Sequence, residues 1–478
     1  MNWSSILQWA RSGNSVLITA AVMLVLAGCS ALMRRRSLET YKRGVLLIDG
    51  RESQRRTARR KKLGAEVLTL AGIAVAAVDE TKHFKLIGTT GTGKSTAIGE
   101  LLGAALARGD RAVFADPDGG YLGRFYDRYR GDIVLNPFEA SSARWDLFAE
   151  IQSSYDIEQL ASGLIPSSED PSSSEWRGYA RTFLTAVIRR CQCEGWRDTA
   201  NLWRLLTMAS AEELRPVVSG TPAQPFLDPD NARMFGSIRS VTGSAIAAFE
   251  YILKQRAAPF SVREWVRART LPGALFIPYK AGQIAALRSM IAAWMRLAIF
   301  EAMSQTEGRD QRLWFVVDEL DALGAIDGLK DALARLRKFG GRCVLGFQSI
   351  AQVSDTYGQG AANTIVENCA NTLILRCSGS ENGGTSQFAS RLIGDREIVR
   401  RQISRGSDRE GTFSMRGTRW SRSITEQHTT EAAVMPSELE QLPDLCGYLK
   451  TASSASWLKV AFDHRIGREH RRADSKHF

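Results

Sequence analysis

The strongest indication of the fold is the segment Gly88-Thr89-Thr90-Gly91-Thr92-Gly93-Lys94-Ser95, which is followed by Thr96. This segment matches the phosphate-binding pattern G-x-x-x-x-G-K-[ST], with a short apolar run before it and an amphipathic helical pattern after it. In such a loop the backbone N–H groups surround phosphate oxygens, Lys94 reaches the β and γ phosphates, and Ser95 offers a hydroxyl to Mg²⁺. We therefore predict that residues 88–96 bind ATP with Mg²⁺.

A phosphate loop of this kind needs an acidic pair at the end of another buried strand. The apolar run 313–317 ends in Asp318-Glu319 and supplies such a pair. We predict that Asp318 holds Mg²⁺ through its water shell and that Glu319 activates the attacking water as a general base. An apolar run followed by Asp-Glu is common, so the prediction depends on its position downstream of the loop in the same sheet.

Two further strand ends carry polar residues whose roles the sequence leaves open. Gln348 follows the apolar run 343–347, where an amide would sense the γ-phosphate or orient the water; an ordinary strand-end residue is the other reading. The segment Asp116-Pro117-Asp118-Gly119-Gly120 is either a simple turn or the edge of an active site.

Short apolar runs alternate with helical patterns along much of the chain, which predicts an α/β fold with a mostly parallel sheet. The expected strands are 84–87, 111–116, 132–136, 273–279, 313–318, 343–348 and 372–377. Apolar residues in 66–78 indicate additional strand material before the loop. No strand is expected between 136 and 273, where helical patterns such as 179–190 and 238–253 predict an all-α region inserted into the sheet domain.

The net charge is +12, and its distribution points to a membrane rather than only to nucleic acid. Residues 34–62 contain 12 basic and 3 acidic residues, which gives +9 of that total. This block follows the uncharged run 16–33, whose 18 residues reach the length of a transmembrane helix. Because basic residues stay on the cytoplasmic side, we expect one span with residues 1–15 in the periplasm and the bulk of the chain in the cytoplasm.

A cleaved signal peptide is the alternative to this membrane anchor, and Leu26-Ala27-Gly28-Cys29 resembles a lipoprotein cleavage site. Signal peptides carry their basic residues before the apolar run, whereas here they follow it, so the anchor is favoured. The seven cysteines are scattered, and neither they nor the five histidines have the spacing of metal ligands. Buried thiols in a reducing compartment are the simplest interpretation.

The ordered set of motifs resembles that of the TrwB/TraD-type coupling proteins of type IV secretion and conjugation. The resemblance covers about residues 66–462 and includes, besides the loop and the acidic pair, residues 116–120, 135–138, 346–349 and 435–445. It implies a RecA-like, homo-hexameric ATPase with an all-α domain in the bacterial inner membrane. Such a protein links relaxase-bound single-stranded plasmid DNA, the relaxosome, to a type IV secretion channel and pumps the DNA.

The resemblance also implies that an arginine after the acidic pair reaches the nucleotide site of a neighbouring subunit. Arg337 matches that position, with Arg335 as the substitute if the alignment shifts; solvated basic residues on a helix are the alternative. The family often has two spans, whereas this chain offers one. The expected divisions are a periplasmic N-terminus at 1–15, a transmembrane helix at 16–33, a basic segment at 34–62, the first part of the nucleotide-binding domain at 63–150, an all-α domain at 151–270, the second part of the nucleotide-binding domain at 271–465, and a basic tail at 466–478.

Contacts with DNA are the least defined at the level of residues. Residues 391–422 are rich in arginine and include Trp420, which suits phosphate contact and base stacking, but a solvated loop has the same composition. Trp176 resembles a family aromatic at the channel mouth, or is a buried tryptophan. The alternative functions are another hexameric DNA translocase or secretion ATPase, and a nucleotide-switched receptor that recruits substrates without motor activity.

Overall fold

The computed structural model describes residues 39–62, 67–168, 170–268, 272–308, 311–380, 383–408 and 419–462. The chain divides into two compact units. The smaller unit combines the described residues up to Leu46 with those between Ile393 and Val434, and the larger unit holds the rest. The predicted span 16–33, its periplasmic neighbour 1–15 and the tail 466–478 lie outside the described residues, and among the described helices none is long and apolar enough to cross a membrane.

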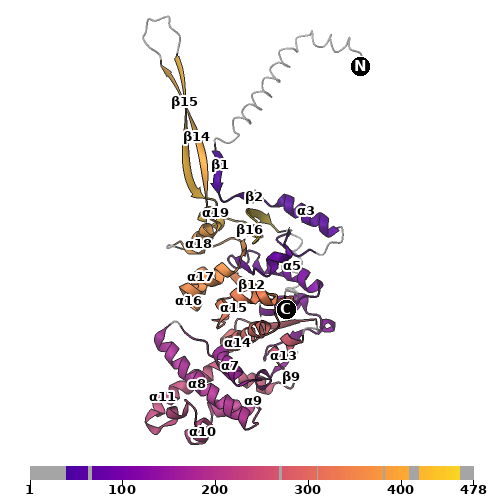
Figure 1. Cartoon of the computed structure of the whole chain (residues 1–478), viewed down its shortest axis with the longest axis vertical. Coiled ribbons are helices and arrows are strands. Elements are labelled where there is room, and N and C mark those ends of the chain that lie inside the picture. The colour runs from indigo at the N-terminus through magenta and orange to yellow at the C-terminus, as the bar shows by residue number, and fades with distance from the viewer. Residues whose placement is uncertain are drawn as a thin grey trace. The chain divides into compact units, whose positions relative to one another are not determined.

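A ten-stranded sheet organises the larger unit, in the order β2-β17-β16-β13-β5-β12-β11-β6-β10-β7 (Figure 1). Its strands are β2 (Leu47–Asp49), β5 (Phe84–Ile87), β6 (Arg111–Pro117), β7 (Ile133–Val134), β10 (Ala274–Tyr279), β11 (Leu313–Val317), β12 (Gly341–Phe347), β13 (Asn371–Ile374), β16 (Cys446–Lys450) and β17 (Trp457–Ala461). The six strands from β13 to β10 pair in parallel, and β16 pairs antiparallel with both of its neighbours. The expected α/β fold with a mostly parallel sheet is confirmed.

The central strands are apolar because both faces of the sheet are covered. One face packs on α5 (Lys94–Ala107) and the short hairpin of β3 (Thr69–Leu70) and β4 (Ile73–Ala74) in a single core cluster. Trp314, Phe84 and Phe114 belong to that cluster and are fully buried, and each such side chain contributes about 1.5–3 kcal/mol. The opposite face contacts α14 (Ile284–Met303) and α15 (Leu329–Leu336).

The remaining helices around the sheet are short. They are α3 (Arg51–Lys62), α4 (Ala77–Glu80), α6 (Gly120–Phe125), α16 (Ile350–Tyr357), α17 (Gln359–Asn368), α18 (Gly384–Ile393) and α19 (Pro436–Glu440), with 3₁₀ turns η1 (Arg128–Arg130), η2 (Phe148–Glu150) and η5 (Arg337–Phe339). The basic stretch 34–62 is thus more than a charged segment: its described part forms β1, β2 and α3, and β2 joins the large sheet beside β17.

Residues 154–267 are mainly helical, as the sequence patterns indicate (Figure 1). The helices are α7 (Ser154–Leu164), α8 (Pro171–Cys193), α9 (Thr199–Thr207), α10 (Ala211–Val218), α11 (Ala232–Ala245), α12 (Phe249–Lys254) and α13 (Val262–Arg267), with η3 (Gln224–Leu227) and η4 (Pro229–Asn231). Side-chain caps start several of them; Asp198, for example, accepts the N–H groups of Ala200 and Asn201. The expectation of no strand here needs correction, because β8 (Arg144–Trp145) and β9 (Pro259–Phe260) form a short parallel pair. Two residues each are too few for a sequence pattern to reveal.

The smaller unit is a three-stranded antiparallel sheet in the order β1-β14-β15. β1 (Glu39–Gly44) pairs with the base of β14 (Asp395–Asp408), which pairs along its whole length with β15 (Arg419–Ala432). At the base, Glu397 binds Lys42, Arg43 and His428, and the hydrogen bonds from the two basic side chains lower the pKa of Glu397 to about 2. The arginine-rich stretch 391–422 therefore contains strand where the sequence suggested a loop or a DNA contact.

Candidate nucleotide site

The phosphate loop runs from β5 into α5 and depends on glycines in two places. Gly91 and Gly93 have φ of +77° and +116°, which side chains with a Cβ rarely adopt. A Cβ on Gly93 would also come within 2.8 Å of Leu445 Cδ2, so the backbone there runs close to another segment. Because α5 begins at Lys94, the N–H groups of its first turn have no partner within the helix and carry the positive end of its dipole. The loop thus presents donors suited to an anion.

Lys94 lies within the loop rather than extending into solvent. Its Nζ donates to the carbonyl oxygens of Gly88 at 2.7 Å and Thr89 at 3.2 Å, and the side chain is buried. Burial lowers the pKa of Lys94 below that of an exposed lysine, and the negative charges of Asp318 and Glu319 partly offset that effect. The ammonium group is therefore placed at the loop with two carboxylates nearby.

Asp318 follows β11 and meets Ser95 at the start of α5. The Ser95 hydroxyl donates to Asp318 Oδ2 at 2.6 Å, whereas Asp318 Oδ1 is buried and has no hydrogen-bond partner among the described residues. One serine hydroxyl and one free carboxylate oxygen suit Mg²⁺, which usually binds through one or two protein groups, water and phosphate. The described residues include no cluster of three or more His, Cys, Asp or Glu able to hold a metal by themselves.

Glu319 and Gln348 are joined by a hydrogen bond at the ends of two neighbouring strands. The Gln348 amide donates to Glu319 Oε1 and accepts from the Thr90 hydroxyl at 3.1 Å, so it connects the phosphate loop to the glutamate. Burial raises the pKa of Glu319, and the charges of Asp318 and Asp321 raise it further. A carboxylate with a raised pKa is a stronger base, which suits the role predicted for Glu319.

The two candidate arginines lie away from this group. Arg335 is near the end of α15, and Arg337 opens η5 just before β12; both side chains are exposed. The charge of Arg337 acts on His83, which precedes β5, whereas the phosphate loop follows β5. Arg337 therefore lies at the amino edge of the sheet and the loop at its carboxyl edge. The structure brings Lys94, Ser95, Asp318, Glu319 and Gln348 together and keeps both arginines apart from them.

Tyr121 and Leu445 also reach the site, although neither was predicted individually. The Tyr121 hydroxyl donates to Asp318 Oδ2 at 2.8 Å, and the Leu445 N–H donates to the Thr92 carbonyl at 2.9 Å. The segment 116–120 is both a turn and an edge of the site, because it leads directly to Tyr121. Asp116 is fully buried there, and burial raises its pKa to about 7. Leu445 belongs to the motif 435–445 that the resemblance already singled out.

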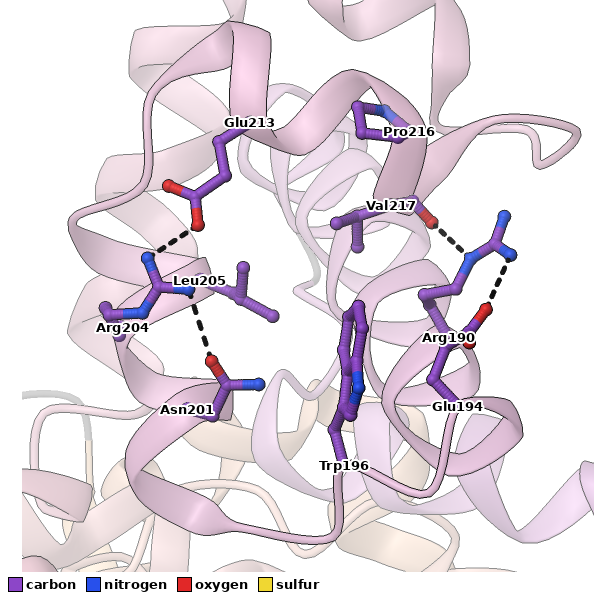
Figure 2. A pocket seen from close by; sticks show the side chains of 9 residues that line it. All are labelled: Arg190, Glu194, Trp196, Asn201, Arg204, Leu205, Glu213, Pro216 and Val217. Carbon is purple, nitrogen blue, oxygen red and sulfur yellow. Dashed lines mark hydrogen bonds and ion pairs between the residues drawn. The ribbon is translucent and has the colours of Figure 1, made fainter.

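Two cavities accompany the site and the helical region. A cleft of about 990 Å³ lies beside the phosphate loop, and its lining includes Thr90, Gln348, Phe388 and Arg391. A smaller cavity of about 460 Å³ lies among α8, α9 and α10, with Trp196 projecting into it between the ion pairs Arg190–Glu194 and Arg204–Glu213 (Figure 2). Trp176, which the sequence left open, lies on α8 and is half-buried.

Comparison with known proteins places these features together in one family. The family model described as the type IV secretion-system coupling protein DNA-binding domain matches residues 67–463. Coupling protein TraD of Escherichia coli (strain K12) is 31% identical over 397 residues, which cover 81% of this chain and 53% of TraD. Structures of the plasmid coupling protein TrwB are also similar. The complex with the non-hydrolysable ATP analogue ADPNP has a TM-score of 0.76 at 29% identity and covers 89% of this chain and 94% of TrwB.

A second TrwB structure, the complex with ADP and Mg²⁺, has a TM-score of 0.76 at 29% identity and covers 88% of this chain and 94% of that one. The likeness to TrwB confirms the RecA-like form of the sheet domain. The chain spans about half the length of the curated relatives that it matches, such as TraD.

Proposed function

The chain belongs to the family of type IV secretion-system coupling proteins, and on that premise we propose that it is a Mg²⁺-dependent ATPase that couples DNA to a secretion channel in bacterial conjugation. The observation that carries the proposal is the geometry of the phosphate loop. Lys94 and Ser95 at the start of α5, Asp318 and Glu319 after β11, and Gln348 after β12 converge on one edge of the sheet. The TrwB complexes with ADPNP and with ADP and Mg²⁺ support ATP and Mg²⁺ as the ligands.

The residues of the site have distinct roles in this proposal. The N–H groups of residues 88–96 bind the phosphates of ATP, and Lys94 leaves its carbonyl partners to neutralise the β and γ oxygens. Ser95 and Asp318 would hold Mg²⁺, which neutralises charge on the phosphates when bound. Glu319 accepts the proton of the attacking water, and Gln348, bonded to both Glu319 and Thr90, orients that water relative to the loop.

A neighbouring subunit completes the site in this proposal. Arg337, or Arg335, lies too far from the loop of its own chain, since β5 alone separates the two edges of the sheet by roughly 13 Å. An exposed arginine at the opposite edge suits a head-to-tail ring, in which each subunit supplies a rigid cation to the next one. A homo-hexamer, as the family resemblance implies, is the proposed assembly.

The remaining parts of the proposal concern partners and location. Residues 16–33 anchor the chain once in the inner membrane, residues 1–15 lie in the periplasm, and the rest is cytoplasmic. Residues 151–270, mainly helical apart from the short strand β9, form a domain inserted between the two parts of the nucleotide-binding domain. Single-stranded DNA, the relaxase and its relaxosome, and channel components are the proposed partners, supported by the family description, which names a DNA-binding domain.

The test is the ATPase rate of the full chain, in detergent or vesicles, with and without single-stranded DNA. We expect Mg²⁺-dependent turnover that single-stranded DNA increases, and we expect Lys94→Ala to lose it while remaining folded, because the side chain that neutralises the phosphates is gone. Turnover that survives in Lys94→Ala contradicts the assignment of the site. ATP binding without DNA-stimulated turnover favours a nucleotide-switched receptor instead of a motor.

A further inference from the structure

Tyr121 contacts the aspartate of the nucleotide site from a different element than Ser95 does. Its hydroxyl donates to Asp318 Oδ2 at 2.8 Å, and the Ser95 hydroxyl donates to the same oxygen at 2.6 Å. The other oxygen, Oδ1, is buried and accepts no hydrogen bond from any residue that the structure describes. Both protein donors thus occupy one oxygen of the carboxylate and leave the second one available.

Tyr121 is itself firmly held. The side chain is only 4% exposed, and its ring stacks on Phe114 of β6 with centroids 5.5 Å apart and 24° between the planes. Its backbone N–H donates to Asp116 Oδ1 at 3.0 Å, and the N–H of Leu122 donates to Asp116 Oδ2 at 2.7 Å. Because Asp116 accepts both N–H groups at the start of α6, it fixes the position from which the tyrosine ring projects.

The turn between Asp116 and Tyr121 is equally constrained. Asp118 and Gly119 both have positive φ, +57° and +71°, which reverses the chain within a few residues. The Asp118 N–H donates to the carbonyl oxygen of Tyr279 at 2.8 Å, which ties the turn to β10. Left-handed backbone at a non-glycine residue costs about 1–3 kcal/mol and persists where the surrounding structure enforces it. This turn places Tyr121 beside the end of β11, the strand that leads directly into Asp318.

The orientation of Asp318 depends on such donors. The terminal torsion of an aspartate is broad and prefers no single carboxylate orientation, so its hydrogen bonds decide which oxygen points where. With Ser95 as the single donor, the carboxylate could turn about that bond. We propose that Tyr121 is a positioning residue for Mg²⁺-nucleotide binding: with Ser95 it fixes Asp318 so that Oδ1 is left for the ion's hydration shell, and Asp116 acts by holding Tyr121.

This inference rests on the proposed nucleotide site. A binding measurement tests the role of Tyr121 separately from the existence of that site. The full chain is titrated with fluorescently labelled ADP, once with Mg²⁺ and once with EDTA, and the ratio of the two dissociation constants gives the gain in affinity due to Mg²⁺. For Tyr121→Phe we expect that gain to fall about tenfold, the size of one hydrogen bond to a charged group, while affinity in EDTA stays unchanged. Tyr448→Phe, at a buried tyrosine in β16 (6% exposed), is the matched control and should keep the wild-type ratio.

Asp116 is tested in the same assay. Asp116→Asn removes one of the two acceptors for the N–H groups of α6 and should lower the gain by less than Tyr121→Phe does. The double variant should match Tyr121→Phe alone within about twofold, because Asp116 acts through the tyrosine. A wild-type Mg²⁺ gain in Tyr121→Phe overturns the inference, and so does an equal loss of affinity with and without Mg²⁺, which indicates a merely structural role. No Mg²⁺-dependent binding in the wild type overturns the nucleotide site as well.

Discussion

His83 is a buried histidine whose charge state the structure defines. It is 2% exposed; its Nδ1 accepts the N–H of Cys343 at 3.1 Å, and its Nε2 lies 2.9 Å from the carbonyl oxygen of Leu333. This pattern assigns the neutral ring with its proton on Nε2. Burial lowers the pKa of His83 from 6.5 to about 4, and the charge of Arg337 contributes to the shift. The folded protein therefore holds this ring uncharged near neutral pH.

A pH dependence of stability follows from His83. Below pH 6.5 the unfolded chain binds a proton that the folded chain does not bind until about pH 4. The contribution of His83 to the free energy of unfolding is therefore fully present above pH 6.5 and is lost as the pH falls from 6.5 towards 4. We expect a loss of about 2 kcal/mol between roughly pH 7 and pH 5 from this residue. Urea unfolding gives the free energy of unfolding of the wild type and of His83→Asn at both pH values. The contribution of His83 is the difference between the two proteins in how far this free energy falls as the pH is lowered. An equal fall in stability for the wild type and for His83→Asn contradicts the prediction.

Some residues of the site could be predicted from the sequence because they belong to a motif or stand at a strand end. Lys94 belongs to the phosphate-loop motif, whereas Asp318, Glu319 and Gln348 follow buried apolar runs, and parallel strands bring their carboxyl ends to one edge. Tyr121 follows no such rule. Its position depends on the positive φ of two turn residues and on a carboxylate five residues earlier, and neither constraint appears in a pattern of apolar spacing.

At the scale of elements, β11 and β12 approach each other so closely that only glycine fits at one position. A Cβ on Gly346 would lie 2.0 Å from the carbonyl oxygen of Asp318, and the Leu320 N–H donates to the Gly346 carbonyl at 3.1 Å. We expect Gly346→Ala to lose about 2–4 kcal/mol of stability, because backbone atoms must move to remove the clash. Urea unfolding measures the loss, and ATP binding should fall with it as Asp318 shifts.

Gly360→Ala is the matched control for this change. Gly360 lies in α17, where an added Cβ meets nothing within 4 Å, and alanine favours a helix by about 0.5–1 kcal/mol over glycine. The free energy of unfolding of Gly360→Ala should therefore equal that of the wild type or slightly exceed it. Similar stability of the two alanine variants would show that the strands separate easily, contrary to the close packing seen here.

The elements that the sequence predicted are those with local signals. The apolar runs at 84–87, 313–318 and 343–348 became β5, β11 and β12 almost as expected. In contrast, β2, β16 and β17 were not predicted, because they are short and partly charged and gain their stability from partners far along the chain. The β14–β15 hairpin was also missed, since its arginine-rich sequence resembles a solvated loop until the antiparallel partner is known.

At the scale of the molecule, the sheet separates two functions at its two edges. The phosphate loop lies at the carboxyl edge and the exposed Arg337 at the amino edge, so in the proposed ring one chain would carry half of each of two composite sites. Two such surfaces on one subunit form a head-to-tail interface, which closes into a ring if the rotation between subunits allows it. In the proposed ring, ATPase activity is therefore a property of the assembly rather than of the single chain.

Mixing two inactive variants tests whether the arginine acts between subunits. Lys94→Ala loses the loop lysine and Arg337→Ala loses the proposed trans cation, so neither alone should hydrolyse ATP at more than a few per cent of the wild-type rate. In an equal mixture about a quarter of the interfaces combine an intact loop with an intact arginine, and we expect a comparable fraction of activity to return. Lys94→Ala mixed with Glu319→Ala is the control, because both lesions fall in the same half of the site and no intact interface can form. If the first mixture stays as inactive as the control, Arg337 does not act in trans, and the same experiment with Arg335→Ala decides whether that residue replaces it.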